Sequence, residues 1–267
     1  LLAPGRHRLT NVPELVDVST TLSLLGRIGC PSLVSPGTVQ LDTTRISFSE
    51  APYDLVRRMR ASVLALGPLL ARCGTAKVSL PGGCAIGMRP IDQHLKGMEA
   101  LGAKFELRDG YVYGEAEKLV GARIVLDVPT VTGTENILMA AVLAEGHSQI
   151  ENAAREPEIV DLANFLNSLG AKIKNAGEST IEIEGVSSLA PPEEAYSILP
   201  DRIEAATYLI AGAITGGDLT ITGAKADDLK PVLAKLEEAG CEINCENGAI
   251  RLQRNGPIRS VNISTAP

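Results

Sequence analysis

The feature that most limits how this chain can fold is a pattern repeated along most of its length. Each copy reads as an amphipathic helix, a glycine, and two strand-like runs joined by a turn. Glycine can adopt the positive φ found just past a last helical turn, so it marks each helix end. These helix-ending glycines, separated by 73, 68 and 70 residues, are Gly29, Gly102, Gly170 and Gly240.

A second series of helix-to-strand junctions runs in phase with the first. Its glycines are Gly5, Gly74, Gly146 and Gly216. Helix starts recur near Pro52, Pro129, Pro200 and Pro267. Proline suits a first helical turn because its missing N–H would be unpaired there. Hairpin turns are predicted at Asp109-Gly110, Ala176-Gly177 and Asn247-Gly248. The predicted unit is therefore β-α-β-α-β-β.

The order of elements in this unit sets an expectation for the two ends. The sequence starts at Leu1, just before Gly5, so the first unit lacks its opening strand and helix. It stops at Pro267, where the first helix of the next unit should begin. Units of this kind bury their helices against neighbouring units. We therefore expect the sequence to be an internal piece of a longer protein.

Composition excludes several classes of function. Acidic residues outnumber basic ones by 32 to 25, and a net charge of −7 argues against a general nucleic-acid binder. The longest aliphatic run, from Ile137 to Ala144, is far short of the ~18 residues of a membrane span. Five cysteines, an odd number, fit reduced thiols in a cytoplasm. Cys241 and Cys245 lack zinc-site spacing, so neither a metal nor a cofactor is expected.

The segment 81–90 breaks the regular pattern and is the strongest candidate for chemistry. It reads PGGCAIGMRP and lies between a predicted strand and a predicted helix. Such a glycine-rich loop exposes backbone N–H groups near the positive end of a helix, which suits an anion. The same surroundings, with Arg89 nearby, lower the pKa of a thiol such as Cys84 and make it reactive. The alternative is a surface loop with an incidental cysteine.

Three other segments carry polar groups at predicted helix starts. A helix is expected from Pro52 to Cys73, with Arg60 in its first turns either binding an anion or facing solvent. His94 follows the glycine-rich segment, with Asp92 and Gln93 beside it. The turn 129–136 contains Thr130 and is read as a helix-capping cluster.

These residues also resemble a known family. The segments 51–62, 81–90, 151–173 and 199–209 closely resemble the bacterial UDP-N-acetylglucosamine 1-carboxyvinyltransferases, which are enolpyruvyl transferases. The resemblance covers essentially the whole sequence. It implies an inside-out α/β barrel built of βαβαββ units. It also implies that residues 1–199 form most of a first domain and that 200–267 begin a second.

The resemblance further implies an activity. This family transfers the enolpyruvyl group of phosphoenolpyruvate to the 3′-hydroxyl of UDP-N-acetylglucosamine and releases phosphate, which commits material to peptidoglycan and the cell wall. Cys84 matches the family's proton donor, which also forms a covalent adduct. Matching positions for substrate binding are Arg60, Arg89, Pro90, Ile91, Asp92, Gln93, His94, Thr130, Val131 and Arg202.

Two departures from the family pattern matter. Val128 stands where some members have a lysine at the nucleotide wall. The family's Lys-Asn pair would lie before Leu1 and its general-base Asp beyond Pro267, so the 267 residues alone are expected to be inactive. Two other functions stay open at this point. One is a catalytically inert UDP-sugar-binding homologue with a regulatory role, and the other is a thiol redox sensor.

Overall fold

The computed structural model describes residues 1–56, 59–80 and 90–264. They fall into two compact units, Leu1–Ile198 and the described residues from Leu199 onward, called here the larger and the smaller unit. The sequence-based boundary at residues 199 and 200 lies beside this division. That the two units correspond to two domains of a longer protein stays a prediction.

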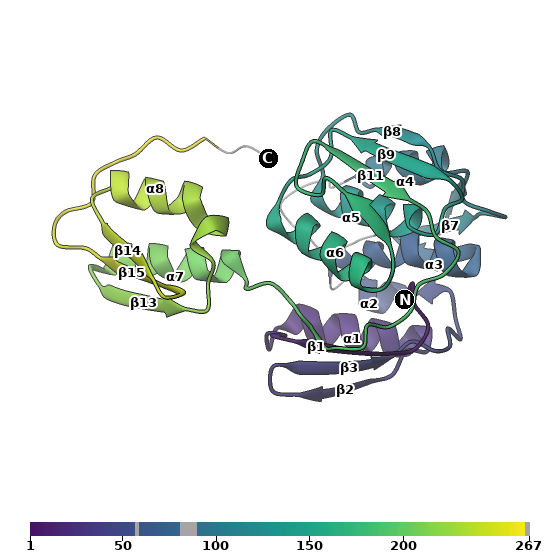
Figure 1. Cartoon of the computed structure of the whole chain (residues 1–267), viewed down its shortest axis with the longest axis horizontal. Helices are drawn as coiled ribbons and strands as arrows, with labels where there is room; N and C mark the ends of the chain where they lie inside the picture. The colour runs from purple at the N-terminus through teal and green to yellow at the C-terminus, as the bar shows by residue number, and fades with distance from the viewer. Residues whose placement is uncertain (57–58, 81–89, 265–267) are drawn as a thin grey trace. The chain divides into compact units, whose positions relative to one another are not determined.

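Three four-stranded sheets of one design build the larger unit (Figure 1). In each sheet an edge strand runs parallel to its neighbour, and two antiparallel strands follow. The first sheet has the order β12 (Tyr196–Ser197), β1 (Arg6–Thr10), β3 (Thr38–Asp42), β2 (Ser32–Ser35). The second is β4 (Glu50–Ala51), β5 (Thr75–Ser79), β7 (Tyr111–Glu115), β6 (Lys104–Arg108). The third is β8 (Arg123–Val125), β9 (His147–Glu151), β11 (Thr180–Glu184), β10 (Lys172–Lys174).

Strand β12 closes the first sheet from far along the chain. Leu9 pairs with Tyr196, and Thr10 pairs with Ser197, in parallel register. In the other two sheets this edge place belongs to β4 and β8, which open their own units. In the first sheet the same edge place is taken by β12, from the end of the larger unit. The sheet is therefore four-stranded, like the other two.

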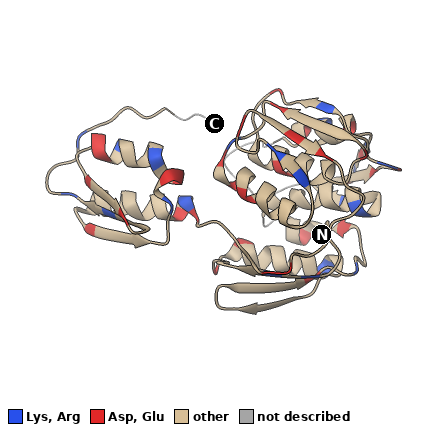
Figure 2. Cartoon of the chain, in the orientation of Figure 1, with Lys and Arg blue, Asp and Glu red and all other residues tan. Residues whose placement is uncertain are grey.

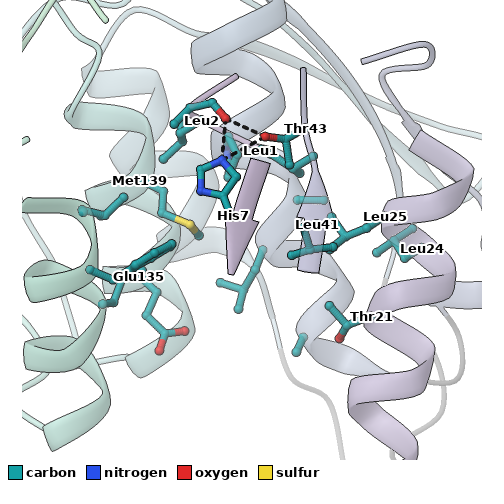
Figure 3. A pocket seen from close by; sticks show the side chains of 18 of the residues that line it. Leu1, Leu2, His7, Thr21, Leu24, Leu25, Leu41, Thr43, Glu135 and Met139 are labelled. Atoms are coloured by element: carbon teal, nitrogen blue, oxygen red, sulfur yellow. Dashed lines mark hydrogen bonds between the residues drawn. The ribbon is translucent and has the colours of Figure 1, made fainter. Parts of the chain in front are cut away.

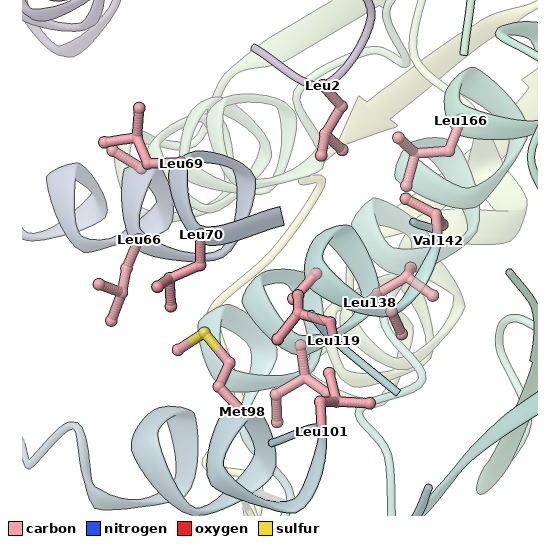
Figure 4. Packing of buried hydrophobic residues seen from close by; sticks show 14 of the residues in the cluster. Leu2, Leu66, Leu69, Leu70, Met98, Leu101, Leu119, Leu138, Val142 and Leu166 are labelled. Carbon is pink, nitrogen blue, oxygen red and sulfur yellow. The ribbon is translucent and has the colours of Figure 1, made fainter. Parts of the chain in front are cut away.

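Helices lie among the three sheets of the larger unit (Figure 1). They are α1 (Val16–Ile28), α2 (Tyr53–Val56), the 3₁₀ helix η1 (Arg60–Ala65), α3 (Leu66–Cys73), α4 (Asp92–Ala100), α5 (Val131–Ala141) and α6 (Pro157–Ser168). Strands such as β11 alternate buried and exposed residues, so one face of each sheet covers the helices. Their apolar side chains form one continuous core, part of which Figure 4 shows. This arrangement confirms the inside-out α/β fold.

Two glycines let neighbouring helices approach α5 closely. A Cβ built on Gly67 of α3 would lie 2.3 Å from the backbone oxygen of Asn136. A Cβ on Gly97 of α4 would lie 2.2 Å from a side-chain atom of Ile137. Because real Cβ atoms do not approach other atoms this closely, Gly67 requires glycine as the backbone stands, whereas at Gly97 the Ile137 side chain would have to move.

The predicted continuous helix from Pro52 to Cys73 is wrong. Met59 has extended backbone angles, with φ −146° and ψ 118°, and α2, η1 and α3 are separate elements. Pro68 explains part of the change, since it has no N–H to donate to the carbonyl of Leu64. A regular α-helix would need that bond, whereas the first turn of α3 does not.

Most of the predicted helix ends and hairpin turns are present. The helix-ending glycines all have positive φ, between 99° for Gly102 and 108° for Gly29. Asp109-Gly110 and Asn247-Gly248 both have positive φ at each residue, as type I′ hairpin turns require. The third hairpin differs, because β10 ends at Lys174 and β11 starts at Thr180. Its longer loop places Asn175 and Gly177 at positive φ in place of a tight Ala-Gly turn.

The smaller unit follows the order of the repeat from its first helix onward. Its elements are α7 (Arg202–Thr215), β13 (Asp218–Thr222), η2 (Ala226–Leu229), α8 (Lys230–Glu238), β14 (Glu242–Glu246) and β15 (Ala249–Gln253). The strands form a sheet of order β13-β15-β14 with antiparallel pairing throughout. A separate apolar cluster, including Leu209, Leu233 and Leu252, joins the two helices to this sheet.

Charged residues of both signs are scattered over helices and strands (Figure 2). Cross-strand ion pairs form among them, such as Arg123 with Glu151 at 2.5 Å and Arg251 with Asp218 at 2.7 Å. Exposed pairs of this kind contribute little stability, about 0–1 kcal/mol each. Ion pairs of this kind are therefore no sign of a binding site by themselves.

Candidate functional site

The described candidate residues of the larger unit gather at the starts of three elements. Arg60 is the first residue of η1, and Asp92 is the first residue of α4. Val131 is the first residue of α5 and directly follows Thr130, its N-cap. Helix starts carry unpaired N–H groups and the positive end of the helix dipole. Groups of this kind suit an anionic ligand.

His94 connects these elements from the centre of the group. It is 1% exposed. Its Nδ1 lies 3.1 Å from the side-chain nitrogen of Asn136, and its Nε2 lies 3.3 Å from the hydroxyl of Thr132. Burial and the nearby Arg60 lower the pKa of His94 to about 4, against the opposing effect of Asp92. His94 is therefore neutral at pH 7 and is a hydrogen-bonding group there, not a charge.

The Gln93 side chain is held by hydrogen bonds inside the protein, and its substrate-binding role stays a prediction. Its side-chain nitrogen donates to Asp92 at 2.9 Å and to Asp127 at 3.0 Å. Its side-chain oxygen accepts from the backbone N–H of Asp127 at 2.9 Å. The buried amide thus joins the start of α4 to the segment between β8 and α5. Lys96 donates to the same Asp127 and, with Gln93, keeps the pKa of this carboxyl below its usual range.

The turn before α5 behaves as a cap. The Thr130 hydroxyl accepts from the backbone N–H of Gly133 at 3.2 Å. Gly133 suits this place, because a Cβ there would lie 2.3 Å from the Thr130 methyl carbon. The neighbouring Val128 is exposed. The capping interpretation of Thr130 is confirmed, and the cap fixes where Val131 starts the helix.

The remaining predicted site residues lie in varied settings. Pro90 is exposed and Ile91 is buried, both just before α4. Cys84 and Arg89 lie outside the described residues. Arg202 belongs to the smaller unit, where it is the first residue of α7, after the N-cap Asp201. The Asp201 carboxylate accepts from the N–H groups of residues 203 and 204 at 2.8 and 3.0 Å.

An apolar cavity of about 370 Å³ in the larger unit is lined in part by residues of η1 and α5 (Figure 3). Its wall includes Leu24, Leu162, Phe165 and Met139. Glu135 also contacts it, and burial together with Glu158 and Glu156 raises the pKa of this carboxyl to about 7. A hydrocarbon lining of this kind does not suit anions. The cavity is therefore not the predicted phosphate or nucleotide site, and nothing in the sequence analysis pointed to it.

Sequence analysis also missed Asn136 and Asp127, which join the helix starts. Asn136 is fully buried on α5, directly before the apolar stretch ILMAAVLA. A polar amide at the edge of such a stretch is the signal that could have indicated a buried hydrogen-bonding role. In the part of the chain that the structure describes, no cluster of three or more His, Cys, Asp or Glu could hold a metal ion. None of the described helices is long and apolar enough to cross a membrane.

The fold and these helix starts define a class of protein. The family model for EPSP synthase (3-phosphoshikimate 1-carboxyvinyltransferase) matches residues 1–267, and the chain belongs to this family of carboxyvinyltransferases. Among solved structures, the enolpyruvyl transferase NikO from Streptomyces tendae aligns with TM-score 0.84 and 24% identity. That alignment covers 96% of this chain and 62% of NikO. EPSP synthase from Acinetobacter baumannii aligns with TM-score 0.74 and 18% identity, over 98% of this chain and 62% of that one.

Sequence relatives narrow the class to one type of transferase. The chain is 54% identical over 268 residues to the UDP-N-acetylglucosamine 1-carboxyvinyltransferase of Trichlorobacter lovleyi. It is 52% identical over 267 residues to that of Geobacter metallireducens. Each alignment covers 100% of this chain and 64% of the relative, so the chain spans less than two thirds of their length. The chain is a homologue of these enzymes, and the resemblance seen in its sequence is confirmed.

Proposed function

We propose that the intact protein transfers the enolpyruvyl group of phosphoenolpyruvate to the 3′-hydroxyl of UDP-N-acetylglucosamine and releases phosphate. The observation that carries this proposal is the 54% identity to an enzyme of that name along the whole chain. The reaction would be the first committed step of peptidoglycan synthesis. Its substrates are water-soluble anions, which fits a cytoplasmic enzyme without a metal or cofactor.

In the proposed reaction a proton and the sugar oxygen add across the double bond of phosphoenolpyruvate, and the double bond is then restored. The Cys84 thiol delivers a proton to the methylene carbon of phosphoenolpyruvate while the sugar 3′-hydroxyl gives its proton to a general base and its oxygen bonds to the adjacent carbon. The tetrahedral product then loses a methyl proton to the Cys84 thiolate and expels phosphate, which takes the proton held by the base, giving the enol ether. The Cys84 sulfur can bond to the same carbon in place of the sugar oxygen, which forms a covalent phospholactoyl adduct.

The remaining site residues would bind the two substrates. Arg60 and Arg89 would hold phosphate and carboxylate oxygens through their planar guanidinium groups. The start of α4, from Pro90 to His94, and the start of α5, with Thr130 and Val131, would hold the nucleotide. Arg202 would contribute from the start of α7. Support for these roles comes from the position of each described residue at or beside a helix start.

The first test uses the intact mass of the purified intact protein, of which these 267 residues account for 28.0 kDa, with and without phosphoenolpyruvate. A working Cys84 gains one phosphoenolpyruvate-sized adduct, and Cys84→Ser abolishes it. Cys73→Ser is the matched control. The Cys73 residue is exposed, and desolvation raises the pKa of its thiol. This variant should leave the adduct unchanged. Adduct formation that survives Cys84→Ser would contradict the proposed role of this thiol.

The second test measures phosphate release with both substrates. The intact protein should turn over, and Cys84→Asp should retain part of this activity because a carboxyl can also donate a proton. The 267-residue chain should bind UDP-N-acetylglucosamine weakly and release no phosphate. An intact protein that binds the sugar nucleotide without any turnover would favour the inert, regulatory homologue instead.

A further inference from the structure

Asn136 joins three elements of the candidate site through one buried side chain. Its amide nitrogen donates to the carbonyl oxygen of Val63 in η1 at 3.0 Å and faces Nδ1 of His94 in α4 at 3.1 Å. Its amide oxygen accepts from the backbone N–H of Gly67 in α3 at 2.7 Å. Asn136 itself is on α5 and is 0% exposed. All of its hydrogen-bonding groups are therefore used inside the protein.

The partners of Asn136 fix which way its amide points. The Gly67 N–H can only donate, so the atom facing it must be the amide oxygen. The carbonyl of Val63 can only accept, so the atom facing it must be the amide nitrogen. The same nitrogen faces His94, and because it can only donate, Nδ1 of His94 must accept. In a neutral imidazole the proton is then on Nε2, which donates to the hydroxyl of Thr132.

We propose that Asn136 is a positioning residue that holds His94 as its Nε2–H tautomer and, through Thr132, sets the first turn of α5 for nucleotide binding. Thr132 directly follows Val131, and Thr130 caps the same turn. Two of the three residues in this turn are the ones proposed to contact the nucleotide. The part of this inference that concerns binding rests on the proposed function, whereas the tautomer of His94 does not.

The charges around His94 agree with a neutral ring. Arg60, at the start of η1, disfavours a second proton on the imidazole, and Asp92 on its own helix favours one. From α5 the ring faces the uncharged Thr132 and Asn136. A doubly protonated ring would also direct Nδ1–H at the amide nitrogen of Asn136, donor against donor.

The first experiment is nitrogen-15 NMR of the histidine side chains in the 267-residue chain. The sequence has three histidines, so His94→Gln assigns the signal. The expected result is a neutral Nε2–H ring that does not titrate between pH 5.5 and 8. A neutral Nδ1–H ring, or a titration near the ordinary histidine value of about 6.5, would overturn the proposal.

Variants of Asn136 then separate positioning from simple packing. Asn136→Asp keeps the shape but offers an acceptor, so His94 should gain a proton on Nδ1 and titrate near pH 6.5. Asn136→Leu removes all three bonds and should weaken UDP-N-acetylglucosamine binding about 10-fold by calorimetry. Thr134→Val is the control on the same helix, because its hydroxyl accepts from Ala154 and does not contact His94. It should leave both the His94 spectrum and the binding unchanged.

The outcomes distinguish this inference from the proposed function. If the unaltered chain does not bind the nucleotide, the result counts against the proposed function. The tautomer of His94 still tests the role of Asn136 in the fold. If the chain binds and Asn136→Leu shifts the His94 signals without changing the affinity, positioning for the nucleotide is overturned. An equal loss in Thr134→Val would also overturn it, because general destabilisation of α5 would then explain both variants.

Discussion

Helices α5 and α7 occupy the same place in two copies of the repeating unit but are buried very differently. Both follow an N-cap, Thr130 or Asp201, whose side chain accepts from the first turn. Eight residues after each cap a leucine packs toward the sheet, and Leu138 and Leu209 are both 0% exposed. At the preceding residue the two helices differ in burial. Ile137 is 0% exposed, whereas Tyr208 is 57% exposed.

The difference comes from neighbours, since both helices are apolar on more than one face. Around α5 the larger unit places α3, α4 and α6, with Gly67 and Gly97 allowing close approach. In the smaller unit α7 packs on its own sheet and on α8, and Ile203, Ile210 and Ile214 remain exposed. Burial of the second face is therefore a property of the assembled repeats, as in other repeat proteins.

The largest expected effect tests this difference at equivalent positions. Ile137→Ala should lower the free energy of unfolding of the larger unit by about 3 kcal/mol, because it leaves a cavity in a fully buried region. Tyr208→Ala should change that of the smaller unit by less than about 0.5 kcal/mol. Urea unfolding followed by circular dichroism measures both. Equal losses would show that the exposed face of α7 is covered in solution.

Glycines in the same pair of units give a second, smaller contrast. Gly67→Ala should cost about 2 kcal/mol, since the added Cβ meets the Asn136 backbone oxygen at 2.3 Å and α3 must move away from α5. Gly212→Ala on α7 meets nothing closer than 3.4 Å. It should instead stabilise the helix by up to about 1 kcal/mol, because alanine favours helix over glycine. Thermal unfolding of the two variants checks the opposite signs, and a stabilising Gly67→Ala would contradict the close packing of α3 on α5.

The smallest expected effect concerns pH. Burial and two neighbouring glutamates raise the pKa of Glu135 to about 7 in the folded chain, above its value of 4.5 in a solvated carboxyl. Between these two values the unfolded state binds fewer protons, so the free energy of unfolding should fall as the pH rises, by about 1–2 kcal/mol. Glu135→Gln should remove this slope. The equivalent position on α7 is Ala206, so the smaller unit should lack it. Urea unfolding at pH 5 and pH 7.5 compares the two proteins, and an unchanged slope in Glu135→Gln would contradict this assignment.

Much of the local structure could be read from the sequence because its causes are local. Gly29, Gly102, Gly170 and Gly240 end helices through their own backbone freedom. Thr130 caps α5 through a contact three residues away. The boundary between η1 and α3 also has a local cause in Pro68, yet the apolar spacing of the region favoured one long helix. Periodicity describes which face is apolar, and it does not show where hydrogen bonding is interrupted.

The candidate site could be predicted from the sequence only in part. Motifs identified Arg60, Asp92, His94, Thr130 and Val131 through resemblance, and the structure brings these residues to three neighbouring starts of η1, α4 and α5. The resemblance did not distinguish a side chain free to meet a ligand from one used inside the protein. Gln93 belongs to the second kind, because both ends of its amide bond to Asp127.

The sequence by itself determined the repeating unit, its helix ends and caps, and the family to which the chain belongs, because each depends on neighbours within a few residues or on direct sequence match. Only the tertiary structure decided which apolar faces are covered, that β12 completes the first sheet beside β1, and that Asn136 links α3, α4 and η1. These features join residues tens to nearly two hundred positions apart. Their energy depends on distances in space, which no local pattern of residues specifies.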